Sequence, residues 1–137
     1  MTLTFRAIAE DEPGPKWSAL FAQYWPSYRN WWLREGATAR PTYLECRRAI
    51  RTYMPAMAPL WEELCELAGG GDLEARFLSF YCPPPYLSGC SQAIWPGDTP
   101  LLVRNYDYAP EAFDAVVLKT NWMGRQVIGM SDGMFGL

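Results

Sequence analysis

Histidine is absent from the 137 residues of this sequence. The absence excludes Ser–His and Cys–His catalysis carried by these residues alone, and it removes the most common protein ligand of zinc. A nucleophile in this chain would therefore need another base. The α-amino group of a chain terminus is one of the few alternatives, because its ordinary pKa is about 8.

Long apolar runs and a surplus of basic residues are missing as well. The apolar runs are too short to cross a bilayer, and Met1–Glu12 lacks the basic start and apolar core of a signal peptide. The net charge of -3 gives no electrostatic reason to bind nucleic acid or anionic lipid. We therefore expect neither a membrane nor a nucleic acid among the partners.

The cysteines show no CxxC spacing; they are Cys46, Cys65, Cys82 and Cys90. Without a secretion signal, we expect free thiols in a reducing cytoplasm rather than disulfides. Half of the residues are hydrophobic, which allows a sizeable core in a single domain of ordinary size.

The first half of the chain has a helical pattern. Aromatic residues recur at three- and four-residue steps over Trp17–Trp32, which predicts an amphipathic helix that Pro26 kinks or divides. This aromatic face is expected to pack in the core rather than to line an acyl pocket. Thr42 and Glu45 have the spacing of a capping box, so a second helix, made irregular by prolines, should run from there to Gly69–Gly71.

The second half reads as strands. Arg76–Tyr81 is a short aromatic stretch, and Cys90–Trp95 and Leu101–Tyr108 flank a turn and predict a hairpin. Ala115–Thr120 and Gln126–Met130 predict a second hairpin. Helices followed by antiparallel strands make an α+β fold.

Two hairpins make a poor sheet alone, and Met134–Leu137 reads as the start of another strand. We therefore expect this chain to be a fragment of a longer protein. Residues 1–89 form a helical leader in this interpretation, and residues 90–137 form the incomplete start of a strand-rich part.

Cys90 follows Gly89 at the start of a predicted strand, and cysteine is the strongest nucleophile among side chains at neutral pH once its thiolate is favoured. Attack of the Cys90 thiol on the Gly89 carbonyl would give a thioester by an N-to-S shift. Water would release it and leave Cys90 as a free amino terminus whose amine can act as base. The proline-rich stretch Cys82–Gly89 predicts an exposed, unpaired linker before this bond.

The predicted partner strand carries Arg104, Asn105, Tyr106 and Asp107. A regular strand places Arg104 and Tyr106 on one face and Asn105 and Asp107 on the other. An arginine near a thiol favours the thiolate, and a carboxylate near an α-ammonium group holds it and tunes its pKa. A bulge or bend would be needed for both Arg104 and Asp107 to reach Cys90.

Gly-Cys at a strand start, followed by Arg-Asn-Tyr-Asp in the next strand, resembles the N-terminal-nucleophile hydrolase superfamily. The nearest branch is that of isopenicillin N acyltransferase, with penicillin V acylases and choloylglycine (bile-salt) hydrolases as relatives. The resemblance covers roughly Leu87–Leu137 and implies an αββα sandwich. It implies self-cleavage between Gly89 and Cys90, with Cys90 as nucleophile supported by Arg104 and Asp107. The oxyanion-hole asparagine of the family would lie beyond Leu137.

The leader, residues 1–89, resembles in character the α-chain cleaved from the acyltransferase precursor, whereas the leader of bile-salt hydrolases is usually very short. The resemblance implies hydrolysis or transfer of an acyl group at a linear amide, with no metal and no organic cofactor. If the enzyme transfers the group, an acyl-coenzyme A thioester is one candidate substrate. Leader and catalytic chain are expected to stay associated, and a homo-oligomer is compatible with this function.

Other interpretations stay open. Cys90 can be a small buried hydrophobe, Arg104 and Asp107 a strand ion pair, Asn105 a turn residue and Tyr106 a packing residue. The chain can be a non-enzymatic interaction domain that uses its aromatic helical face. It can also be a cysteine hydrolase with a histidine outside this chain, or a precursor that never matures.

Overall fold

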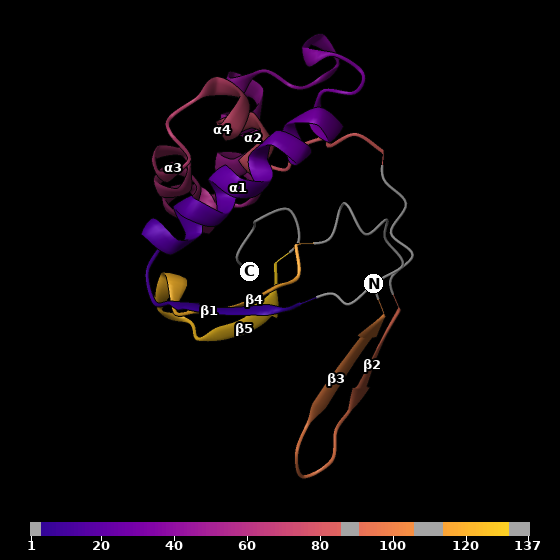
Figure 1. The fold of residues 1–137 in the computed structure, drawn as a ribbon. Helices are drawn as coiled ribbons and strands as arrows, with labels where there is room; N and C mark the ends of the chain where they lie inside the picture. Colours follow the sequence, from indigo (N-terminus) through magenta and orange to yellow (C-terminus); the bar gives the residue numbers. More distant parts are fainter. Residues whose placement is uncertain (1–3, 86–90, 106–113, 132–137) are drawn as a thin grey trace.

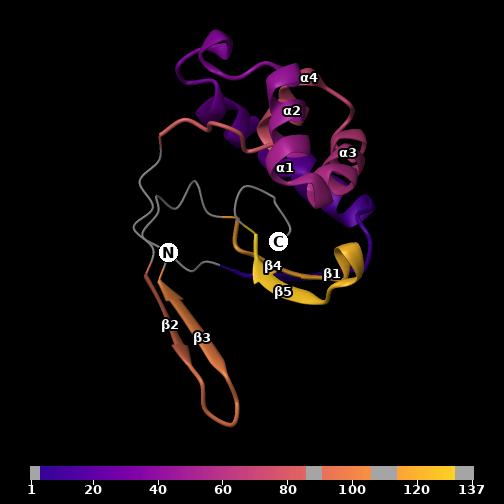
Figure 2. The ribbon, with the colours of Figure 1, turned by 180° about the vertical axis from the view of Figure 1, so that it is seen from behind.

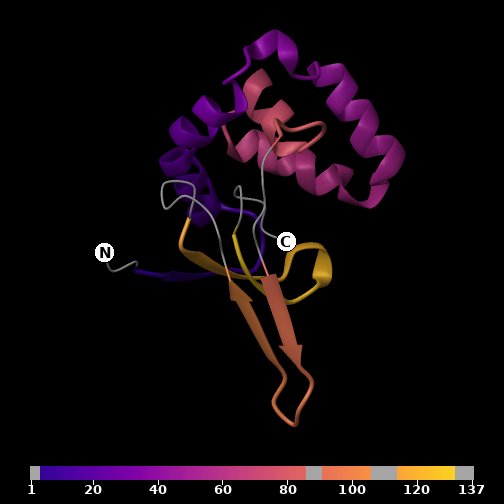
Figure 3. The same ribbon diagram turned by 90° about the vertical axis from the view of Figure 1, so that its right-hand side faces the viewer.

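The computed structural model describes residues 4–85, 91–105 and 114–131. In this part of the chain, helices α1 to α4 lie together on one side of a small sheet of β1, β4 and β5 (Figure 1). A hairpin of β2 and β3 projects away from both, and the views from behind and from the side agree (Figures 2 and 3). The mixed, α+β character predicted from the sequence is therefore confirmed.

Helix α1 spans Pro15–Trp32 and continues through Pro26, where the sequence predicts a kink or division. Pro26 is exposed, so water can satisfy the backbone carbonyl that a proline leaves without its donor. Aromatic side chains on both sides of Pro26 pack on the ring of Phe77 and hold the helix together. The rings whose centroids lie within 6.4 Å of the Phe77 centroid include Phe21, Trp25, Tyr28 and Trp32.

The aromatic face of α1 forms the centre of the core, as expected. Trp17 and Trp32 are both 0% exposed, and Phe21 is 2% exposed. Residues from the sheet side join the same cluster, including Val116 and Leu118. Since this face is covered by the chain's own helices, it does not offer the exposed aromatic surface that the interaction-domain interpretation requires.

Helix α2, Tyr43–Tyr53, begins with the predicted capping box. The Thr42 amide donates to Glu45 Oε2 at 2.8 Å, and the Glu45 amide donates to Thr42 Oγ1 at 3.4 Å. A 3₁₀ turn at Pro55–Met57 then separates α2 from α3, Ala58–Leu67. The one irregular helix of the prediction is thus two helices, divided where proline removes a backbone donor.

Helix α4 spans Asp72–Leu78, so the strand predicted over Arg76–Tyr81 is wrong. A short aromatic run does not distinguish a strand from a buried helical segment. Asp72 and Glu74 occupy the first turn, where acidic side chains favour a helix through its dipole. Phe77 is 1% exposed, and its burial against α1 favours a helix over a strand in this segment.

The three-stranded sheet has the order β1-β4-β5. Strand β4, Val116–Thr120, pairs antiparallel with β5, Val127–Met130, as the sequence predicts. Strand β1, Arg6–Glu10, pairs parallel with β4, although the sequence predicts strands only after the helices and only antiparallel pairing. A five-residue strand whose partner lies at the other end of the sequence carries little local signal.

The separate hairpin consists of β2, Ser91–Trp95, and β3, Leu101–Asn105, paired antiparallel. Every residue of both strands is exposed. The large apolar side chains among them are 56% to 71% exposed; they are Ile94, Trp95, Leu101, Leu102 and Val103. Because both faces carry apolar side chains, the hairpin has the composition of strands that are buried on two sides.

None of the helices in the described ranges combines the length and the apolar character needed to cross a bilayer.

Candidate functional site

Two pairs of predicted site residues lie outside the described residues. They are Gly89 and Cys90, at the predicted cleavage site, and Tyr106 and Asp107. Two of the predicted site residues are described. Arg104 and Asn105 are the last residues of β3, at the open end of the hairpin. The bulge needed to bring both Arg104 and Asp107 to the cysteine thus stays a prediction.

The register of the hairpin fixes which residues lie across from the predicted site. Ser91 pairs with Asn105, and Gln92 pairs with Arg104. Residues directly opposite in an antiparallel pair point to the same face. Arg104 therefore lies on the same face of the hairpin as Gln92, two residues after Cys90 in the sequence. Asn105 lies on the same face as Ser91, the residue directly after Cys90.

The first part of the proline-rich linker is held on the helices rather than free. Pro84 is less than 2% exposed. The guanidinium of Arg34, just beyond α1, donates a hydrogen bond to the carbonyl oxygen of Pro85. The predicted exposure is therefore wrong for Pro84, which is buried. Pro85 is exposed as predicted, but its carbonyl is paired with Arg34.

Two other thiols are poor nucleophiles. Burial, with the nearby carboxylates of Glu62 and Glu66, raises the pKa of the Cys65 thiol to about 12. Burial also raises the pKa of Cys46. A thiol reacts as its thiolate, so neither side chain is suited to attack a carbonyl at neutral pH.

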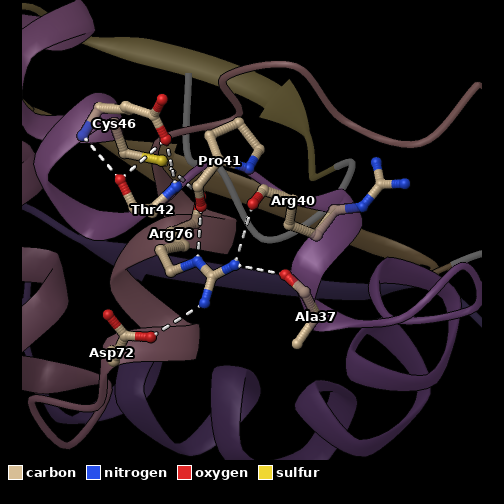
Figure 4. A network of polar contacts seen from close by, with 8 residues as sticks. Ala37, Arg40, Pro41, Thr42, Cys46, Asp72 and Arg76 are labelled. Carbon is tan, nitrogen blue, oxygen red and sulfur yellow. Dashed lines mark hydrogen bonds and ion pairs between the residues drawn. The ribbon is translucent and has the colours of Figure 1, made fainter.

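Sequence reasoning missed a buried arginine that joins α4 to the segment before α2 (Figure 4). Arg76 is 9% exposed, and its Nε donates to the Pro41 carbonyl at 2.7 Å. Its Nη2 donates to the carbonyls of Ala37 at 2.8 Å and Arg40 at 3.2 Å, while Nη1 bonds Asp72 Oδ2 at 3.1 Å. These bonds to three carbonyls and one carboxylate, which we call the carbonyl cage, use four of the five N–H donors of the guanidinium. The cage therefore has a structural role, since it joins α4 to the segment before α2.

A second network missed by the sequence joins α1 to the sheet through Asp114, which is 4% exposed. The Tyr28 hydroxyl donates to Asp114 Oδ1, and the Ser131 hydroxyl lies 3.2 Å from Oδ2. The Tyr24 hydroxyl donates to the Asp114 carbonyl at 2.9 Å and accepts from Arg6 at 2.5 Å. The Asp114 carboxylate, two residues before β4, thus accepts hydrogen bonds from Tyr28 of α1 and from Ser131, which directly follows β5.

Within the described ranges, no group of three or more cysteine, aspartate or glutamate residues is arranged to hold a metal ion. No family model, no curated protein and no solved structure matches the chain. The resemblance therefore depends on the residues around Cys90 and Arg104 themselves.

Proposed function

We propose that this chain belongs to an autoproteolytic cysteine amidohydrolase or acyltransferase of the isopenicillin N acyltransferase type. Cys90 becomes the amino-terminal nucleophile after cleavage following Gly89. The observation that carries the proposal is the hairpin register, in which Ser91 pairs with Asn105 and Gln92 with Arg104. This pairing supports a site where the residues after Cys90 lie beside the segment that bears the arginine and the aspartate.

In maturation, the Cys90 sulfur attacks the Gly89 carbonyl carbon. The carbon–sulfur bond forms, the carbon–nitrogen bond breaks, and the thiol proton passes to the released amine. Water then hydrolyses the thioester, which leaves a carboxylate on Gly89 and a thiol and a free amine on Cys90. With no histidine in the chain, this amine is the base that takes the thiol proton in catalysis.

In catalysis, the thiolate of Cys90 attacks the carbonyl of a linear amide and forms an acyl thioester, and the amine of Cys90 gives its proton to the leaving nitrogen. Arg104 favours the thiolate, and Asp107 positions the ammonium group. Asn105 and Tyr106 support the substrate or the strand. In a hydrolase, water attacks the acyl thioester, releases the carboxylic acid and restores the Cys90 thiol. In a transferase, an amine takes the acyl group from the thioester instead, and an acyl-coenzyme A can supply an acyl group to the Cys90 thiol with release of the coenzyme A thiol.

Contacts across the proposed cleavage site support a leader that stays with the catalytic chain. Strand β1 of the leader pairs with β4 over five residue pairs. Tyr24 and Tyr28 of α1 donate hydroxyl hydrogen bonds to Asp114, which follows the cleavage site. The free thiols Cys46, Cys65 and Cys82 suit the reducing cytoplasm that we propose as its compartment.

The intact mass of the purified protein tests this proposal, beside Cys90→Ala. Two fragments that meet between Gly89 and Cys90, absent from the variant, are expected. Cys82→Ala is the matched control, because it removes an exposed cysteine of the same linker and should leave cleavage unchanged. A single uncleaved mass in the unaltered protein contradicts the proposal, since it leaves Cys90 without its base.

The exposed hairpin favours a second candidate, a non-enzymatic interaction domain. Its apolar strand residues, rather than the buried aromatic face of α1, would meet the partner. This candidate predicts an uncleaved chain whose hairpin becomes protected from hydrogen exchange in a complex. Trp95→Lys, at a side chain that is 67% exposed, should abolish the complex without unfolding the protein.

A further inference from the structure

The sheet of β1, β4 and β5 has an apolar face that points away from the helices. Val116 and Leu118 of β4 are buried in the core with the helices. Side chains alternate along a strand, so Val117 and Lys119 point to the opposite face. The strand register adds neighbours to this outer sheet face; they are Ala7 and Ala9 of β1 and Ile128 and Met130 of β5.

This outer sheet face has the composition of a surface that is covered. A sheet with one solvated face normally carries polar residues there. Of the residues that the register places on the outer sheet face, Lys119 alone is charged and the others are apolar. Ile128 is nevertheless 72% exposed. An exposed apolar surface of this kind indicates an interaction site.

The hairpin of β2 and β3 carries a surface of matching chemistry. The pairing register puts Ala93, Trp95, Leu101 and Val103 on one face, which we call the wide hairpin face. None of these residues is charged. Trp95, Leu101 and Val103 are 67%, 56% and 66% exposed. A two-stranded hairpin is marginally stable in water unless its apolar side chains pack on something else.

Both surfaces are open to the same side of the molecule. The hairpin projects from the side of the sheet opposite the helices, and the three views agree (Figures 1, 2 and 3). Every residue of its strands is exposed, so the wide hairpin face and the outer sheet face do not cover each other within one copy. A partner that approaches from this side meets both surfaces.

We propose that two copies of the chain associate through these surfaces, with the wide hairpin face of each copy packed on the outer sheet face of the other. This arrangement is isologous, so it covers both surfaces in both copies and closes at two. A second copy is the partner that fits, because surfaces whose one charge is Lys119 present no charge pattern for an acidic or basic partner to recognise. The association does not depend on cleavage.

The area agrees with a specific dimer of modest affinity. The exposed parts of Trp95, Leu101, Val103 and Ile128 amount to roughly 400 Å² of apolar surface in each copy. With the smaller side chains around them, two copies would bury about 1,200 Å², at the lower end of the range for specific interfaces. Because association also costs translational and rotational freedom, the dissociation constant should be on the order of micromolar.

Sedimentation velocity of the full-length Cys90→Ala protein, in which cleavage plays no part, tests the inference between about 1 and 200 µM. The dimer should form as the concentration rises. Trp95→Lys on the hairpin and Ile128→Lys on the sheet should each weaken it at least about tenfold, since each puts a charge into an apolar contact. Leu44→Lys is the matched control, because it puts the same charge at a 65% exposed leucine of α2 and should leave the dimer unchanged.

A change of fold is distinguished from a lost contact at the lowest concentration, where the copies are separate. Trp95 and Ile128 are exposed, so both variants should melt there at the temperature of the Cys90→Ala protein. An Ile128→Lys variant that dimerises normally overturns the inference, since the sheet is then not part of the contact. A Cys90→Ala protein that stays monomeric also overturns it, whether its hairpin amides exchange rapidly or are protected. Either result leaves the proposed function to its own mass measurement, made with Cys90 in place.

Discussion

Replacing Arg76 by methionine tests the polar network that joins α4 to the segment before α2. The change keeps the apolar stem but removes every donor from the carbonyls of Ala37, Arg40 and Pro41. Arg76 is 9% exposed, so these acceptors lose partners that water replaces only in part. At about 1 kcal/mol net for each bond, the loss is about 3 kcal/mol. Asp72 adds little, because its side chain is 61% exposed.

Urea unfolding followed by tryptophan fluorescence measures this change, with seven tryptophans as probes. With a slope of about 2 kcal/mol per molar urea, the midpoint of Arg76→Met should fall by roughly 1.5 M. Arg48→Met, at an exposed arginine of α2, is the control and should shift the free energy of unfolding by less than about 0.5 kcal/mol. A midpoint that moves no further for Arg76→Met than for Arg48→Met refutes the argument that the cage stabilises the fold.

Two further predictions concern α2 and the thiols. Thr42→Ala should cost about 1 kcal/mol by removing the cap, whereas Thr52→Ala, at an exposed position near the end of α2, should be nearly neutral in the same urea assay. The Thr42 amide and hydroxyl lower the pKa of Glu45, so the capping contribution is present above its ordinary value of 4.5 and is lost as the pH falls through the lowered value. For the thiols, mass mapping of the Cys90→Ala protein after alkylation at pH 8 should find Cys82 modified first, because it is exposed. Cys46 and Cys65 should react only on unfolding, since burial raises both pKa values, and early modification of Cys65 would contradict its value of about 12.

The parts of the fold that the sequence predicts correctly are those with a local signal. Thr42 and Glu45 stand three residues apart and form the capping box that begins α2. The hairpin of β2 and β3 follows from two apolar runs on either side of a proline–glycine turn. The aromatic period of α1 likewise predicts the buried face, because helical spacing alone puts those rings on one side.

The parts that could not be predicted depend on contacts between distant residues. Strand β1 is stable only beside β4, and nothing in Arg6–Glu10 indicates that partner. Arg76 bonds backbone carbonyls, which every residue carries, so no residue type marks where its partners lie. The strand predicted over Arg76–Tyr81 failed for a related reason, since burial of Phe77 against α1 decides the helix.

The proposed cleavage divides the sequence, but the described contacts do not divide the fold at the same place. Leader residues supply β1 to the sheet and hydroxyl donors to Asp114, whereas β4 and Asp114 belong to the other side of the cut. Cutting one peptide bond removes none of these contacts. It does convert unfolding into dissociation, so the stability of the cleaved protein depends on its concentration, whereas that of a monomeric precursor does not. If the chain is cleaved as proposed, residues 1–89 would therefore be a permanent part of the fold and not a segment to be discarded.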